Sequence, residues 1–188
     1  IFLQSEAAAN KLKISCRRSK TYHGVPQLVL GKNKWFREFL CRCGIEQKDK
    51  KHIADKLMNM DLSNISSLLR GLFDTDGYVQ KGLNAGFSNT SKELIYQIKK
   101  CLLRFGIISW IKSKPAGKMK IYSKSYNTLP HYELIINNNN SIISFYENIG
   151  FSVRRKQKSL QELIMKINSN IHYVYCRKCG YKLYKDLF

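Results

Sequence analysis

Acidic residues are scarce in this sequence. Its 188 residues include 13 Asp and Glu against 33 Lys and Arg, which gives a formal net charge of +20 at pH 7. A soluble chain with so little negative charge is most simply explained by a polyanionic partner, of which nucleic acid is the commonest. A compositional bias is the open alternative, since Lys, Asn, Ile and Tyr are abundant and residues 137–140 are all Asn.

Long hydrophobic runs are also missing. No apolar stretch is long enough to cross a bilayer, and the opening Ile1-Phe2-Leu3 is too short for a signal peptide. We therefore expect an intracellular protein, in the cytoplasm, nucleoid or an organelle matrix, without a membrane partner. Its six irregularly spaced cysteines would then be mostly reduced. The missing initial methionine predicts a fragment or a processed piece.

Complete motifs for zinc or for a covalent nucleophile are lacking as well. The four histidines are scattered, and no His-Cys or Ser-His arrangement favours covalent catalysis. Cys176 and Cys179 form a CxxC turn, which is half of a zinc knuckle. A structural Zn²⁺ needs four ligands and no second CxxC follows, so Cys176 and Cys179 supply at most half of such a site.

One apolar helix, by contrast, is strongly predicted. Its apolar residues recur at helical spacing and share one face: Ile65, Leu68, Leu69, Leu72 and Phe73. Ser63 is the expected N-cap. Gly71 costs about 1 kcal/mol relative to alanine in a helix, so we expect it to let another backbone approach closely. Gly71, Leu68 and Leu72 are therefore the predicted interface with a partner helix.

Two carboxylates follow at the end of this helix. Asp74 and Asp76 stand beside Gly77, the expected C-cap, where the peptide dipoles already accumulate negative charge. That placement is unfavourable for a purely structural helix. It is explained if a divalent cation neutralises the carboxylate.

The stretch Leu69–Gly77, LRGLFDTDG, resembles the signature of the LAGLIDADG homing endonucleases, with Arg70 in place of the usual small residue. The resemblance implies two such helices packed side by side on a pseudo-two-fold axis, with the last acid of each binding the metals that cut DNA. Asp76 would then be catalytic, Asp76 and Gly77 would hold the metal, and Asp74 would be more structural. Mg²⁺ is the expected cofactor, because it needs only one or two protein carboxylates.

The family also places a basic residue of each half near the scissile phosphate. Lys156 matches that place, and Lys50 is its equivalent in an internal repeat. Four neighbours remain as alternatives: Lys51, Arg154, Arg155 and Lys158. A solvent-exposed run of charge is the plain alternative for each of them.

The order of predicted elements resembles the αββαββα half of this family, an α+β fold with antiparallel DNA-binding sheets. Gly44 and Gly150 each end a helix, and their separation of 106 residues also pairs Phe39 with Phe145. We therefore divide the chain into the trailing part of a first half (1–62), a complete second half (63–168) and a tail with the CxxC turn (169–188). The partner of Asp76 would lie upstream of Ile1, in a missing N-terminal part.

DNA binding is expected on the two sheets. Alternation over residues 11–20 predicts a strand with one basic face, and residues 112–118 are expected to form a basic loop between two strands. Lysines would contact phosphate, and a few polar strand residues would read bases. The candidates are Lys11, Lys13, Arg17, Arg18, Lys20, Asn84, Asn89, Lys112, Lys114, Lys118, Lys120, Tyr122 and Lys124.

The predicted function is that of a site-specific double-stranded DNA endonuclease, associated with an intron or an intein. The alternatives are the same fold without cleavage, as an RNA maturase that binds intron RNA or as a DNA-binding regulator. A basic ribosomal-type module would explain the charge but neither the acidic helix end nor the repeat.

Overall fold

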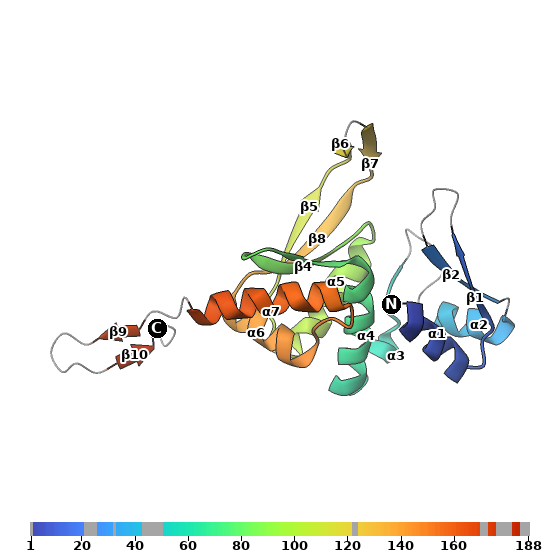
Figure 1. The fold of residues 1–188 in the computed structure, drawn as a ribbon, viewed down its shortest axis with the longest axis horizontal. Helices are drawn as coiled ribbons and strands as arrows, with labels where there is room; N and C mark the ends of the chain where they lie inside the picture. Colours follow the sequence, from blue (N-terminus) through green and yellow to red (C-terminus); the bar gives the residue numbers. More distant parts are fainter. Residues whose placement is uncertain are drawn as a thin grey trace.

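A computed structural model describes residues 2–20, 26–31, 33–42, 51–121, 124–169, 173–175 and 182–184. Groups of helices and groups of strands follow one another along the chain (Figure 1), and every strand pair in these ranges is antiparallel. The predicted α+β class is therefore confirmed. In these ranges no helix has the length and apolarity that crossing a membrane requires.

A four-stranded sheet organises the second half. Its strands are β3 (Gly77–Gln80), β4 (Asn84–Asn89), β5 (Trp110–Lys114) and β8 (His131–Ile136), in the order β3-β4-β8-β5. Four helices accompany it: α4 (Leu62–Asp76), α5 (Lys92–Leu103), α6 (Asn139–Asn148) and α7 (Arg154–Ser169). The sequence α4-β3-β4-α5-β5-β8-α6 reproduces the expected αββαββα order.

The helices cover one face of this sheet, and the core lies between (Figure 1). Ala85 and Phe87 of β4, like Leu134 and Ile136 of β8, are fully buried, because alternate residues of a strand point to the same face. Phe73 of α4 packs against Phe87 and against the helix-side Phe145, with ring centroids 5.4 and 4.8 Å apart. The intervening strand residues occupy the other face, which we call the open face.

A two-stranded arm extends the sheet. Strands β6 (Gly117–Ile121) and β7 (Lys124–Thr128) pair with each other only, and the arm projects well beyond β5 and β8 (Figure 1). The expected basic loop over 112–118 is therefore wrong: Lys112 and Lys114 belong to β5, and Lys118 belongs to β6. The sequence predicted a loop here because Pro115, Ala116 and Gly117 interrupt the pattern that is typical of a strand.

The N-terminal part contains α1 (Phe2–Lys11), β1 (Cys16–Lys20), β2 (Pro26–Leu30), α2 (Lys34–Arg42) and α3 (Asp55–Met58). Residues 11–15 were predicted to be part of a strand, and this prediction is wrong. Helix α1 continues to Lys11 and ends in a turn, in which Lys13 has a φ of 54°. The α5 helix ends in the same way, with Gly106 at φ 69°. In both turns an isoleucine amide bonds back to the helix, from Ile14 to Ala9 and from Ile107 to Leu102.

Helix caps refine the internal repeat. Asn33 caps α2 through the amide of Phe36, and Asn138 caps α6 through the amide of Ser141, so the two caps are 138 − 33 = 105 residues apart. The predicted offset of 106 is thus wrong by one at these helices. Its pairing of Phe39 with Phe145 fails accordingly, since Phe39 is 49% exposed and Phe145 is fully buried.

The short strands β9 (Tyr173–Tyr175) and β10 (Lys182–Tyr184) form a separate hairpin after α7. Cys176 and Cys179 lie outside the described residues, as do Lys50 and Tyr122.

Candidate active site

Helix α4 begins one turn earlier than its apolar stripe indicates. Ser63 was predicted as the N-cap, but the N-cap is Asp61. The Asp61 carboxylate accepts a hydrogen bond from the backbone amide of Asn64 at 3.0 Å. This bond, followed by the Ser63 hydroxyl, lowers the pKa of Asp61 below its ordinary value. An acid at the N-terminus also faces the positive end of the helix dipole.

Gly77 ends the helix as predicted, although its backbone is extended, with φ −79° and ψ 157°. A side chain there would collide with the backbone of Phe73, so the glycine is required by close approach and not by a left-handed turn. Arg70, the departure from the family signature, donates to the carbonyl oxygen of Ile149 at 2.5 Å. Its guanidinium thus ties α4 to the end of α6.

The ends of α4 and α7 are locked together by two residues. Oδ1 of Asp74 accepts the backbone amides of Ser152 and Val153, just before α7, at 2.9 and 3.2 Å. In return Nζ of Lys156, in the first turn of α7, donates to the last carbonyls of α4. These belong to Phe73, Asp74 and Thr75, at 3.0, 2.9 and 3.2 Å. Each charge therefore sits at the helix end whose dipole it complements.

Lys156 has a lowered pKa. Desolvation is the largest cause, and it outweighs the attraction of Asp74 and Asp76, which raises the pKa. The Lys156 ammonium also lies 5.7 Å from the centroid of the Phe151 ring. The predicted catalytic lysine is thus engaged with protein carbonyls in this structure.

Asp76 is exposed at the end of α4, and a residue of the sheet binds its carboxylate. Nδ2 of Asn89 donates to Oδ2 of Asp76 at 2.9 Å, and Oδ1 of Asn89 accepts the amide of Ser91 at 3.0 Å. Asn89 shares its side of β4 with the buried Ala85 and Phe87, so it points toward the helices. Asn89 was predicted to bind DNA. Its orientation toward Asp76 follows from the register of β4 in the sheet, which the sequence does not show.

A cavity of about 500 Å³ opens at Asp76, with Lys51, Ser88, Asn89, Thr90 and His131 among its lining residues. The structure thus brings Lys51 to the acid. The Lys51 backbone is fixed, because its carbonyl accepts the Ser91 hydroxyl at 2.5 Å. Two residues on, Ile53 exchanges two hydrogen bonds with the Gln97 side chain, at 2.6 and 3.0 Å.

The predicted helix interface lies beside this cavity. A methyl group added to Gly71 would have no neighbour within 4 Å, and Gly71 is exposed. Leu68 and Leu72 line a second hollow of about 350 Å³, mostly apolar, into which Phe39 and Leu40 of α2 also project. This side of α4 is therefore open at Gly71 and incompletely packed at the two leucines.

The predicted DNA-binding residues fall into three groups. Lys112, Lys114 and Asn84 lie on the open face, and Lys114 donates to Glu133 at 2.6 Å. In the N-terminal part Arg18 is bound by both carboxylate oxygens of Glu6, while four others are exposed: Lys11, Lys13, Arg17 and Lys20. Lys118 is exposed on the arm, where Lys120 and Lys124 have described backbones only.

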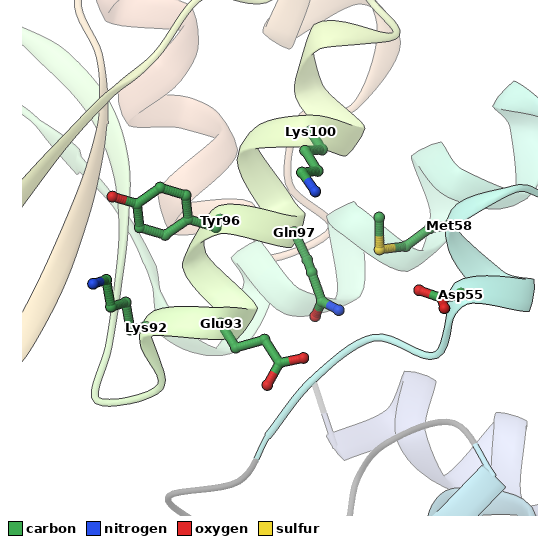
Figure 2. Close-up of a pocket in the computed structure, with 7 residues that line it drawn as sticks. All are labelled: Asp55, Met58, Lys92, Glu93, Tyr96, Gln97 and Lys100. Carbon is green, nitrogen blue, oxygen red and sulfur yellow. The ribbon is translucent and has the colours of Figure 1, made fainter.

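A third hollow lies away from the acid. Its volume is about 690 Å³, and it lies between α3 and α5. Figure 2 shows the side chains that line it: Asp55, Met58, Lys92, Glu93, Tyr96, Gln97 and Lys100. Asp55 and Met58 belong to α3, and the other lining residues lie on the outward side of α5, opposite its buried face. Lys100 and Asp55 consequently serve below as matched controls.

Residues 63–150 match the family model described as LAGLIDADG-like domain. The chain therefore contains a LAGLIDADG-like domain. The match covers α4 through α6, so the acidic helix and the four-stranded sheet are the family's own part of the chain.

Three curated relatives from Methanocaldococcus jannaschii share this LAGLIDADG sequence. The chain is 35% identical over 157 residues to the ATP-dependent DNA helicase Hel308, covering 82% of the chain and 13% of the helicase. It is 34% identical to the replication factor C small subunit, over 73% of the chain and 7% of the subunit. It is 29% identical to a glutamine–fructose-6-phosphate aminotransferase, over 74% of the chain and 12% of the aminotransferase. The chain thus spans about a tenth of the length of these relatives.

Solved structures of the homing endonuclease I-DmoI share the fold. A complex of I-DmoI with DNA and Ca matches with a TM-score of 0.55 at 13% identity, over 85% of this chain and 72% of that one. Mesophilic variants of I-DmoI match with a TM-score of 0.56 over the same shares. At this identity the likeness confirms the LAGLIDADG fold.

Proposed function

We propose that this chain belongs to a site-specific double-stranded DNA endonuclease that uses Mg²⁺ at Asp76 to hydrolyse phosphodiesters. The observation that carries the proposal is an exposed carboxylate at the negative end of a helix, oriented by Asn89. Among the described residues Oδ1 of Asp76 accepts no hydrogen bond, and this leaves one oxygen for a cation. A plain capping role would not need an acid at this pole.

The donor set suits a hard cation that brings its own water and phosphate ligands. Mg²⁺ takes oxygen ligands, needs one or two carboxylates, and when bound in pairs it neutralises charge around the phosphate. In the described ranges no three His, Cys, Asp or Glu side chains cluster, so these residues offer no complete protein cage. Asp76 would hold the cation together with an acid from a second helix.

That second helix would pack along Gly71, Leu68 and Leu72. The open space at Gly71 and the apolar hollow at the two leucines support this position. Among the described residues that line the cavity at Asp76 no second acid is present, so the chain alone should bind duplex DNA but make double-strand breaks poorly.

A basic residue beside the phosphate completes the proposal. Of the predicted lysines and their alternatives, Lys51 lines the cavity at Asp76, whereas Lys156 caps α4. We therefore assign Lys51 to the phosphate and Lys156 to positioning the helix end that carries Asp76.

The curated relatives support an association with a mobile element, an intron or intein. A helicase, a replication factor subunit and an aminotransferase have no activity in common, yet each shares about a tenth of its length with this chain. A segment shared by proteins of unrelated function is most simply an insertion.

The test compares Asp76→Asn with Asp55→Asn, which makes the same change away from the site. Duplexes bound by the wild-type chain are first selected from a random pool, then incubated with Mg²⁺. We expect Asp76→Asn to bind as before but to lose strand cleavage and the effect of divalent cations on thermal stability. Unchanged cleavage would remove Asp76 from the chemistry. The cleavage assay is run on a protein that also carries the second acidic helix. Intact DNA binding without any wild-type cleavage by that protein would favour a DNA-binding regulator, and preference for structured RNA would favour a maturase.

A further inference from the structure

The open face of the sheet contains a single carboxylate. The four strands β3, β4, β8 and β5 include Lys112, Lys114 and His131 but only one acid, Glu133. Glu133 lies on β8, an interior strand, where it pairs with Ser88 on one side and Lys112 on the other. An acid therefore occupies the middle of the sheet face on which DNA binding is expected.

Phosphate binding does not explain this acid. A carboxylate repels the DNA backbone, and a chain with a net charge of +20 has no shortage of cations for phosphates. Strand residues that enter the major groove instead face base edges, which offer hydrogen-bond donors as well as acceptors. A carboxylate accepts hydrogen bonds only, so a base edge that presents donors is its natural partner.

The surroundings hold the Glu133 side chain in place. Nζ of Lys114 donates to Oε1 of Glu133 at 2.6 Å, and Nε2 of His131 lies 3.8 Å from the same oxygen. The Tyr78 ring stacks over Gly86 on this face, where a side chain at 86 would collide with the ring. Burial, with a smaller contribution from the Glu133 charge, raises the pKa of Tyr78. The carboxylate is therefore 16% exposed with restricted freedom, which suits a specific contact.

We propose that Glu133 is a specificity-determining residue that accepts a hydrogen bond from the exocyclic amino group of a cytosine in the major groove. Oε2 of Glu133 accepts no hydrogen bond from the described residues. Cytosine presents only its N4 donor there, whereas adenine places the N7 acceptor beside its N6 donor and would repel a carboxylate. The proposal rests on the proposed DNA binding.

The experiment is a selection of bound duplexes from a randomised pool without Mg²⁺, followed by sequencing. Wild type is compared with Glu133→Gln and with Glu147→Gln, which removes one charge from the exposed side of α6. We expect one position with a cytosine preference of roughly 5- to 100-fold. Glu133→Gln should shift that position toward adenine, because an amide pairs with adenine N6 and N7. Glu147→Gln should keep the wild-type pattern.

Lys112→Met gives a second measurement that removes a neighbouring charge and leaves the Lys114–Glu133 contact in place. It should weaken binding to all duplexes alike and keep the cytosine preference. The proposal is overturned if Glu133→Gln binds more tightly with an unchanged pattern, since the carboxylate would then act only as a charge. It is also overturned if the cytosine preference disappears in Lys112→Met alone. A wild-type chain that binds no duplex would refute the proposed function itself.

Discussion

Lys156→Met tests whether the end of α4 depends on the lysine of α7. Methionine keeps the apolar stem against Phe151 but removes the ammonium from three carbonyl oxygens at 2.9–3.2 Å. Hydrogen bonds to charged groups contribute about 1.5–3 kcal/mol each, and a cation at a helix C-terminus adds about 0.3–1. Because one partly exposed ammonium serves all three carbonyls, we expect a total loss of about 2 kcal/mol.

Such a loss is measurable by thermal and urea unfolding followed by circular dichroism. For a chain of this size, 2 kcal/mol corresponds to a fall in Tm of about 4–8 °C. Lys158→Met is the control, since Lys158 is exposed on the same helix. A double-mutant cycle with Asp74→Ala should be non-additive, because both residues join the same two helix ends. Equal stability of Lys156→Met and Lys158→Met would refute the capping role.

Three further predictions concern the cap, the open face and the helix interface. Asp61→Asn should match wild type near pH 7. As the pH falls through the lowered pKa of Asp61, wild type should lose more unfolding free energy than Asp61→Asn, because the other carboxylates titrate in both proteins. Urea titrations between pH 2 and 6 check this. Lys112→Ala should lower the affinity for duplex DNA and reduce the slope of log affinity against log salt concentration by about 1. Lys100→Ala, on the outward side of α5, should leave both quantities unchanged. Filter binding at several salt concentrations measures them. Gly71→Ala should stabilise the isolated chain by about 0.5–1 kcal/mol and impair cleavage.

Local signals predicted the centre of this fold. The apolar stripe of α4 can be read from spacing alone, because a helix face repeats every 3.6 residues, and Gly77 was predicted to end this helix. Its close approach to Phe73 is visible only in the structure. The αββαββα order followed from the same kind of pattern. The family resemblance then separated Asp74 from Asp76, and the structure does place their carboxylates against different partners.

Non-local contacts decided what the sequence left open. Asn89 looked like a surface strand residue, and only its register with Tyr132 of β8 turns it toward Asp76. Lys156 looked like a free cation because its three acceptors lie about 80 residues earlier in the chain. Lys11 and Lys13 were read as strand because charged and apolar residues alternate there, although α1 and its turn contain them.

Gly71 gives the sharpest test of the missing helix, because stability and function should move in opposite directions. In the structure an added methyl group meets no atom within 4 Å, and α4 is an ordinary helix at this point, so alanine is favoured by its lower backbone entropy. A residue that makes the chain less stable without any local need has to serve a contact that forms elsewhere. If a second helix packs against Gly71, the same methyl group separates the two backbones and moves the paired acids apart. Gly71→Ala that is more stable yet cleaves as well as wild type, measured on a protein with both helices, would show that no such contact exists.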